Sequence, residues 1–534
     1  MNFEKNWTSA QLIVLVALFI ASFANMRFLS KAFASYPANA SNMLFLASLF
    51  VFLIVTIILV LSLFCHYRLV KPVLMLFLLM SASAAYFMDQ YGTIIDQSII
   101  MSIFKTDRRE VHDLFNFKLL AYLLVLGALP SFLIYHARLI YPGHLRETFL
   151  RLRLALGALA LGLLVFVGFW SHYASLFRVH KDIVSYANPV FGLYSVGKQL
   201  YKNHIATPLP FTRLGTDAIL PADHGPRKLV IMVVGETARA DHFSLNGYKR
   251  ETNPLLKQHQ IINFSNFWSC GTLTIDSVPC MFSKLTRASF SRRKAKNQEN
   301  ALDILHRLGV NVLWRDNNSS SKGVADRIPQ EDFLTRKTNP VCDLVECRDV
   351  GMLGGLKDYI AKRPKGDFMI VLHQMGNHGP AYYRRYPQNF RKFMPICRTN
   401  ELSACSQKEL INSYDNAVLY TDYFLAKVID FLKTQDEKFA TSMIYISDHG
   451  ESLGERGVYL HGLPWFMAPE AQRHVPALFW FGSKTDPQLV HTAQKRRTAK
   501  LSHDNLFSTL LGLFHVKTKD YEPKMDILHG EAGS

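Results

Sequence analysis

The sequence is poor in cysteine, with 7 residues in 534, and no two of them have the C-x-x-C spacing. That spacing is typical of thiolate zinc sites, so its absence argues against such a site. The soluble part of the chain has no internal repeat and no low-complexity tract. It also has no nucleic-acid-binding motif, and we therefore expect no nucleic-acid partner.

Long apolar runs are confined to the first 172 residues. Five runs approach the roughly 20 residues that a bilayer requires. They lie near 11–30, 43–65, 70–88, 118–139 and 152–170. The first run is long and four more follow it, which excludes a cleaved signal peptide. The sequence predicts an all-α, five-span membrane domain over 1–172, a connector with an amphipathic helix over 173–220, and a soluble domain over 221–534.

The loops between these runs give the orientation through their Lys and Arg residues. Arg68 and Lys71 follow the second run, and four arginines follow the fourth: Arg138, Arg146, Arg151 and Arg153. Loops rich in Lys and Arg stay in the cytoplasm. Both loops therefore face inside, and everything after residue 172 lies outside. We expect a multi-pass membrane protein with its soluble domain outside the cytoplasm.

The cysteine spacing agrees with an oxidising compartment. Cys65 ends the second run, where a small, buried apolar residue is expected. The other six form close pairs in the soluble part: Cys270 with Cys280, Cys342 with Cys347, and Cys397 with Cys405. Six cysteines allow 15 pairings, so sequence alone does not fix the connectivity. Local disulfides are the favoured interpretation on the oxidising side of a membrane.

The net charge of +18 is shared unequally between the two parts. The first 172 residues hold 13 basic and 7 acidic residues, which leaves a net charge of +12 on the rest. A basic surface of this kind serves solubility, or it attracts an anionic partner such as a membrane surface or a phosphorylated lipid.

From residue 227 onward the chain alternates strands and helices. Apolar, β-rich runs occur at 229–234, 310–314, 368–372, 443–446 and 477–481, and helix-like segments such as 301–308 and 409–433 separate them. This alternation predicts an α/β domain with a mostly parallel sheet covered on both faces. Functional side chains in such sheets gather beyond the C-terminal ends of the strands.

Carboxylates and imidazoles follow three of these strands. Glu236 comes after the first, His373 and His378 after the third, and Asp448 with His449 after the fourth, while His461 lies on a later loop. Each is weak evidence alone, because such residues usually cap helices or face solvent. Together, at one edge of a sheet, their oxygen and nitrogen atoms suit zinc.

The stretch "SCGTLTIDSVPC", residues 269–280, reads as a nucleophile turn between two cysteines. A threonine hydroxyl becomes nucleophilic when a base or a metal lowers its pKa. A disulfide across so short a loop would fix the hydroxyl rather than add much stability. Ser277 is expected to cap a helix with Pro279 in its first turn. The alternative is a capped helix without chemistry.

Several long motifs carry a family resemblance. They are "VVGETARADHFSLNGY", "SCGTLTIDSVPCMFS", "LWRDNNSSSKGVADR", "LHQMGNHGPAYY", "SYDNA" and "SDHGESLGERGVYLHGLP". The chain resembles the lipid A phosphoethanolamine transferases, which include the mobile colistin-resistance enzymes. The resemblance covers nearly the whole chain. It implies a location in the bacterial inner membrane with the soluble domain in the periplasm, and an alkaline-phosphatase-like, sulfatase-type fold for that domain.

By this resemblance Thr274, rather than Thr272, corresponds to the nucleophile that carries phosphoethanolamine. The implied zinc ligands are Glu236, Thr274, Asp448 and His449, for one tightly bound ion with room for a second. His378 and His461 correspond to residues that bind phosphate or a second zinc, and one of them moves a proton. Ser319 and Lys322 correspond to phosphate contacts.

The outside loop between the third and fourth runs also matches the family. Ser102, Thr106 and Glu110 are spaced four apart, which places them on one helix face. The family has an asparagine where this chain has Ser102, and a serine lacks the amide donor. Glu110 is implied to contact the ethanolamine. Its alternative role is a helix-capping partner of Asp107.

The resemblance implies zinc-dependent transfer of phosphoethanolamine from phosphatidylethanolamine to a lipid A phosphate, through a modified threonine. Its partners are those two lipids and the surrounding membrane, and the expected state is a monomer. Resistance to polymyxins and other cationic peptides would follow. The alternatives are a related phosphoglycerol or other phospho-alcohol transferase acting on a different envelope glycan, and a non-catalytic membrane sensor. A sulfatase is disfavoured because no C-x-P-x-R or S-x-P-x-R sequence occurs at the nucleophile turn.

Overall fold

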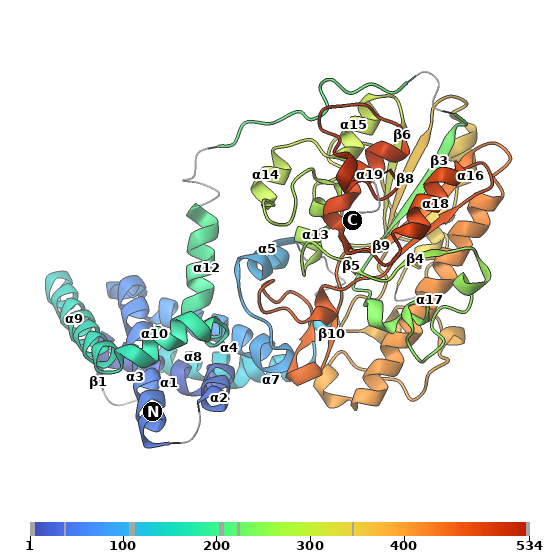
Figure 1. The fold of residues 1–534 in the computed structure, drawn as a ribbon. Coiled ribbons are helices and arrows are strands. Elements are labelled where there is room, and N and C mark those ends of the chain that lie inside the picture. Colours follow the sequence, from blue (N-terminus) through green and yellow to red (C-terminus); the bar gives the residue numbers. More distant parts are fainter. Residues whose placement is uncertain are drawn as a thin grey trace. The chain divides into compact units, whose positions relative to one another are not determined.

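A computed structural model of the chain describes residues 6–36, 39–105, 113–201, 208–221, 225–343 and 346–529 (Figure 1). The chain forms two compact units. One holds residues 1–104 and 114–206, and the other holds residues 105–113 and 207–534. The region predicted as a connector contains α10 (Trp170–Val179), α11 (Lys181–Val184) and α12 (Val190–Leu200). Its role as a connector stays a prediction.

The first unit is helical, as expected. Four of its described helical segments are long and apolar enough to cross a membrane: α3 (Ala40–Phe64), Tyr67–Tyr91, Phe117–His136 and α9 (His144–Gly168). The second segment contains α4 (Val70–Tyr91). The third joins α7 (Phe117–Tyr122), a π-helical turn (Leu123–Ala128) and α8 (Leu129–His136).

The first expected span, over 11–30, is bent rather than continuous. In its place α1 (Ser9–Phe23) and α2 (Met26–Ser35) meet at an angle of 57°. Asn25 lies at the break and donates to the carbonyls of Ile20 and Asn188, while the backbone N–H of Asn188 donates to the Asn25 side chain. These bonds satisfy backbone groups that an apolar environment cannot solvate. A single asparagine barely lowers the hydropathy of the run, so the pattern does not reveal the bend.

The second unit is built on a seven-stranded sheet. Its strands are β3 (Lys228–Gly235), β4 (Ile262–Phe264), β6 (Asn311–Asp316), β7 (Gln330–Asp332), β8 (Phe368–His373), β9 (Ala440–Ser447) and β12 (Ala477–Phe481). They lie in the order β4-β12-β9-β3-β8-β6-β7. The run from β9 to β7 is parallel, and β12 is antiparallel to both neighbours. The predicted α/β domain with a mostly parallel sheet is confirmed.

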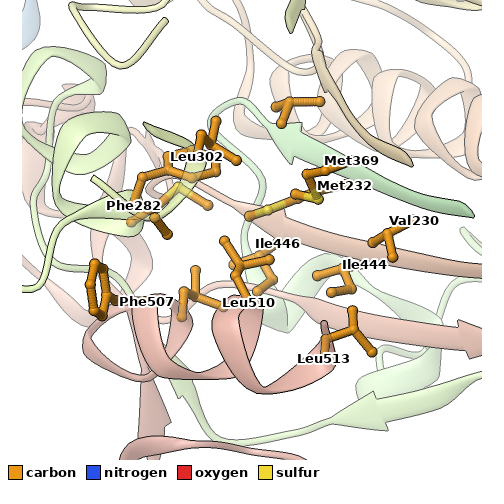
Figure 2. Packing of buried hydrophobic residues seen from close by; sticks show 14 of the residues in the cluster. Val230, Met232, Phe282, Leu302, Met369, Ile444, Ile446, Phe507, Leu510 and Leu513 are labelled. Carbon is orange, nitrogen blue, oxygen red and sulfur yellow. The ribbon is translucent and has the colours of Figure 1, made fainter. Parts of the chain in front are cut away.

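The central strands are buried along their full length, which is typical of a parallel sheet with both faces covered. Alternate side chains of β3, β8 and β9 point toward α19 (Leu506–Leu513), and Figure 2 shows Met232 and Ile446 among them. The nucleophile helix α13 (Thr274–Phe282) joins this core through Phe282. The long helix α17 (Gln407–Lys433) packs against β9.

One carboxylate on α17 lies in the protein interior. Asp422 is fully buried and accepts the backbone N–H groups of Leu255 and Leu256 at 2.9 and 3.0 Å. Burial raises the pKa of Asp422 to about 7. In the unfolded chain the pKa of an aspartate is about 3.9. The folded state therefore favours the protonated carboxyl.

This pKa difference predicts how stability depends on pH. The contribution of Asp422 is fully present below the unfolded pKa and is lost as the pH rises through the folded pKa. From about pH 5 to about pH 8, the thermal unfolding midpoint of the full-length protein in neutral detergent should fall further for the wild type than for Asp422→Asn. The control Asp430→Asn changes an exposed carboxylate of the same helix. Parallel curves for all three proteins would contradict the prediction.

Candidate active site

Two neighbouring strands bring three side chains of the site together. β3 and β9 are parallel neighbours, and Gly235 is in register with Ser447 at their C-terminal ends. The next residues are Glu236 on one strand and Asp448 followed by His449 on the other, all fully buried. Gly235 is required here, because a Cβ atom would lie 2.7 Å from the ring of Tyr445.

Glu236, Asp448 and His449 form a cluster with the geometry of a metal site. Each offers one ligand atom, and these atoms all lie within 4.8 Å of one another. His449 Nε2 is 3.4 Å from Glu236 Oε1 and 3.3 Å from Asp448 Oδ2. The Nδ1 atom of His449 is 2.9 Å from the carbonyl of Gly450, so Nδ1 carries the proton and Nε2 presents a lone pair.

The electrostatics of this cluster call for a cation. Burial and the neighbouring Asp448 raise the pKa of Glu236, and burial raises the pKa of Asp448 to about 7. Asp448 Oδ2 has no hydrogen-bond partner among the described residues. Burial and nearby His461 lower the pKa of His449 to about 4, which keeps the imidazole neutral. Two buried carboxylates and a neutral imidazole fit a divalent metal with a preference for nitrogen and oxygen ligands.

Thr274 is the hydroxyl closest to this cluster. It is the first residue of α13, and its Oγ1 lies 3.2 Å from Glu236 Oε2 and 3.3 Å from His449 Nε2. Thr272 is buried and instead donates to the carbonyl of Leu463 at 2.7 Å. The hydroxyl of Thr274 is thus the one placed to react at the cluster.

The predicted cap of this helix is wrong. Leu273 is the N-cap residue, and Ser277 lies inside the helix, where its buried hydroxyl has no partner in the described part of the chain. Pro279 also lies within the helix rather than in its first turn. The helix thus begins earlier than predicted, at Thr274, although threonine is itself a common N-cap residue.

One disulfide, Cys270–Cys280, and one histidine hold the nucleophile turn. Cys270–Cys280, Cys342–Cys347 and Cys397–Cys405 are bonded, and Cys65 is free and buried, as predicted. His503 is fully buried, accepts the backbone N–H of Cys270 at 3.0 Å and lies 3.0 Å from the carbonyl of Ser447. It therefore joins the turn to the end of β9. Sequence reasoning missed His503, because nothing near it in the chain marks it.

Two more histidines lie beside the cluster. The ring centroid of His461 is 4.4 Å from that of His449 and 5.5 Å from that of His378. Burial and His378 lower the pKa of His461 to about 3. His461 Nδ1 lies 3.2 Å from Glu451 Oε2, and Glu451 is a fully buried carboxyl that sequence reasoning did not single out.

The predicted phosphate contacts lie on the loop after β6. Lys322 Nζ donates to the carbonyl of Ser319 at 3.0 Å, and the hydroxyl of Ser319 donates to Asn318. Asn318 in turn donates to Glu236 Oε2 at 2.8 Å, a contact that sequence reasoning missed. Ser102 lies on α5 (Gln97–Lys105), while Thr106 and Glu110 fall outside the described residues.

A strained turn at Thr237 directly follows Glu236 and supports it. Thr237 has a φ of +50°, a conformation that is uncommon for a threonine. The hydroxyl of Tyr414, on α17, donates to the carbonyl of Thr237 at 2.7 Å and accepts the N–H of Arg239 at 2.9 Å. Tyr414 is fully buried, so these two bonds hold the turn without competition from water.

Known proteins share this architecture. A family profile described as "Sulfatase" matches residues 228–516, and one described as "Phosphoethanolamine transferase EptA/EptB" matches residues 53–204. The fold and the cluster thus define a membrane-attached member of the sulfatase and alkaline phosphatase superfamily.

The similarity to curated relatives extends over nearly the full length. The chain is 47% identical to phosphatidylethanolamine transferase Mcr-1 of Escherichia coli, over 95% of this chain and 96% of that one. It is 41% identical to phosphoethanolamine transferase EptA of Escherichia coli K12, over 97% and 96%. This chain belongs to the phosphoethanolamine transferase family.

Solved structures agree with this membership. Integral membrane lipooligosaccharide phosphoethanolamine transferase A of Neisseria meningitidis matches with a TM-score of 0.93, at 34% identity, over 98% of this chain and 99% of that one. Its soluble domain alone matches at 41% identity and a TM-score of 0.57, over 60% and 98%. The predicted inner-membrane location with a periplasmic domain is confirmed by this architecture.

The support of Glu236 by α17 predicts an effect on metal binding. Tyr414→Phe removes both hydrogen bonds of the turn, and we expect the metal dissociation constant to rise about tenfold through the freed Glu236. The matched control is Tyr445→Phe, because the buried hydroxyl of Tyr445 has no partner among the described residues. Competition titration of zinc against a chelator measures both. Equal affinities in the two variants would show that Tyr414 does not position the ligand.

Proposed function

We propose that this protein is a zinc-dependent enzyme that transfers phosphoethanolamine from phosphatidylethanolamine to a phosphate of lipid A. The observation that carries the proposal is the half-buried hydroxyl of Thr274, 3.2 Å from Glu236 and 3.3 Å from His449. Two relatives support the substrate class. One is a phosphatidylethanolamine transferase at 47% identity, and the other is a phosphoethanolamine transferase at 41% identity.

In the first half-reaction Thr274 Oγ1 attacks the phosphorus of the donor. A bond forms between this oxygen and phosphorus, and the bond between phosphorus and the glycerol oxygen breaks. The hydroxyl proton passes to a neighbouring base, and diacylglycerol leaves after its oxygen takes up a proton. One of His378 and His461 moves one of these protons.

Glu236, Thr274, Asp448 and His449 would hold the metal. When bound, zinc lowers the pKa of the threonine hydroxyl and offsets negative charge on the phosphoryl oxygens. The side-chain amide of Asn318 donates a hydrogen bond to Glu236 and so fixes the orientation of its carboxylate. Ser319 and Lys322 bind phosphoryl oxygens from the neighbouring loop, where the cation of Lys322 provides the charge complement.

In the second half-reaction an oxygen of a lipid A phosphate attacks the same phosphorus. The bond to Thr274 Oγ1 breaks, and the threonine recovers a proton. The product carries an ammonium group that offsets its phosphate charge. Cationic peptides such as polymyxins would then bind the modified lipid less tightly, which supports the proposed resistance. A monomer suffices, because every residue in these steps comes from one chain.

The covalent step gives a direct test. Thr274→Ala should abolish transfer, while the metal stays bound because Glu236, Asp448 and His449 are intact. Thr274→Ser keeps the hydroxyl and should retain part of the activity. Peptide mapping of wild-type protein incubated with donor alone should place phosphoethanolamine on the peptide that contains Thr274. Full activity of Thr274→Ala would instead favour direct transfer between the two lipids.

The role that the resemblance gives to Glu110 is a second test. A carboxylate that pairs with the ethanolamine ammonium contributes about 1.5–3 kcal/mol. Glu110→Gln in the full-length protein should therefore lower transfer roughly tenfold to a hundredfold. Zinc affinity should not change, and Asp107→Asn is the matched control in the same loop. A normal rate for Glu110→Gln would leave Glu110 a helix-capping residue.

A further inference from the structure

A concentration of positive charge follows the nucleophile helix directly. Between Asp276 and Glu299 the chain has six basic residues and no acidic one: Lys284, Arg287, Arg292, Arg293, Lys294 and Lys296. Lys284 and Arg292 are paired with Asp520 and Asp276. Among the described residues, Arg293, Lys294 and Lys296 have no ion pair, while Asp504 accepts the backbone N–H of Arg287 at 2.8 Å. Arg287, Lys294 and Lys296 are exposed, so this charge is presented to solvent.

This segment is fixed to the active site. Four of its residues belong to α14 (Arg292–Lys296). Arg292 forms a two-point ion pair with Asp276 at 2.6 and 3.1 Å, and Asp276 lies on α13 two residues after Thr274. The cations of α14 are therefore held at a set position relative to the nucleophile rather than on a free surface loop.

An aromatic loop adjoins the same segment. Phe466 is 68% exposed, more than any other large hydrophobic residue described in the 207–534 unit, and it follows Trp465. The guanidinium groups of Arg287 and Arg473 lie 4.6 and 5.3 Å from the Trp465 ring centroid. The buried hydroxyl of Thr272 donates to Leu463 of this loop. The loop is thus attached to the nucleophile turn as well.

Arg287 contacts Trp465, and Arg292 joins α14 to the helix that begins at Thr274, so both groups of residues are attached to the nucleophile segment. We call them the basic–aromatic face: Arg287, Arg293, Lys294, Lys296, Trp465 and Phe466. Exposed aromatic residues next to cations are typical of surfaces that bind the interfacial region of an anionic lipid layer. Charge alone would serve solubility, but solubility does not call for an exposed phenylalanine.

We propose that the basic–aromatic face binds the phosphorylated lipid acceptor and delivers its phosphate to the loaded Thr274. This inference rests on the proposed function for the identity of the acceptor. The donor head group is zwitterionic and carries almost no net charge, so a cationic face favours the acceptor over the donor. Once the acceptor carries an ammonium group, the same face attracts it less strongly, which favours release of the product.

The test compares two triple variants with equal loss of charge. Arg293→Gln/Lys294→Gln/Lys296→Gln removes three cations of the face. Lys495→Gln/Arg497→Gln/Lys500→Gln removes three exposed cations that follow or end α18 (Pro487–Lys495). Figure 1 shows α14 and α18 on well separated parts of the unit. A general effect of net charge would change both variants equally.

Binding is measured first, in full-length protein that also carries Thr274→Ala so that no turnover occurs. Neutral detergent micelles containing lipid A are the probe, and micelles containing lipid A without its phosphates are the reference. We expect the face variant to bind phosphorylated lipid A at least about tenfold more weakly than the control variant, with a weaker dependence on salt. Phe466→Ser should weaken binding to both lipids. Equal binding by the two triple variants would overturn the proposal.

Transfer kinetics on the wild-type Thr274 background give the second measurement. We expect the face variant to raise the KM for lipid A while kcat and the rate of Thr274 loading from the donor stay near those of the control variant. A fall in kcat with an unchanged KM would overturn the proposal, because the residues would then act on the chemistry. If wild-type protein binds lipid A through the face but transfers nothing to it, the proposed function is wrong and the binding face stands.

Discussion

Two carboxylates buried side by side are the constraint on which the rest of this molecule depends. Glu236 and Asp448 end adjacent parallel strands, and no Lys or Arg among the described residues pairs with either. Such a pair is costly in a protein interior unless a cation joins it. The surrounding structure, from Asn318 to Tyr414 and His503, holds these groups and the nucleophile turn in place. The buried carboxylate pair thus lowers the folding stability of the protein, and a bound metal would offset this cost.

Much of the fold follows from the sequence. The strands at 229–234, 368–372 and 443–446 are recognisable because they are apolar along their whole length, as a sheet buried on both faces requires. The order of the strands is not recognisable in the same way. Nothing in the sequence around 477–481 shows that β12 is antiparallel, because a buried strand has the same composition in either direction.

Some residues of the candidate site can be predicted from the sequence and others cannot. The rule that residues after parallel strands share one sheet edge brings Glu236, Asp448 and His449 together with several histidines, and the family resemblance selects these three as ligands. His503 and Tyr414 act through single hydrogen bonds between distant segments, and no local pattern encodes such contacts. The helix start at Thr274 was predicted incorrectly because Ser277 has the right chemistry for a cap, and only the backbone shows that Leu273 holds that place.

The long reach of His503 has a consequence for how the protein is made. His503 bonds to Cys270, which precedes it by 233 residues. The chain crosses the membrane from its N-terminus onward, so the nucleophile turn and the first ligand arrive in the periplasm long before this histidine. The contact between His503 and Cys270 cannot form until both segments have been exported. The candidate site is therefore completed only near the end of export, because its turn, its first carboxylate and this histidine come from distant parts of the chain.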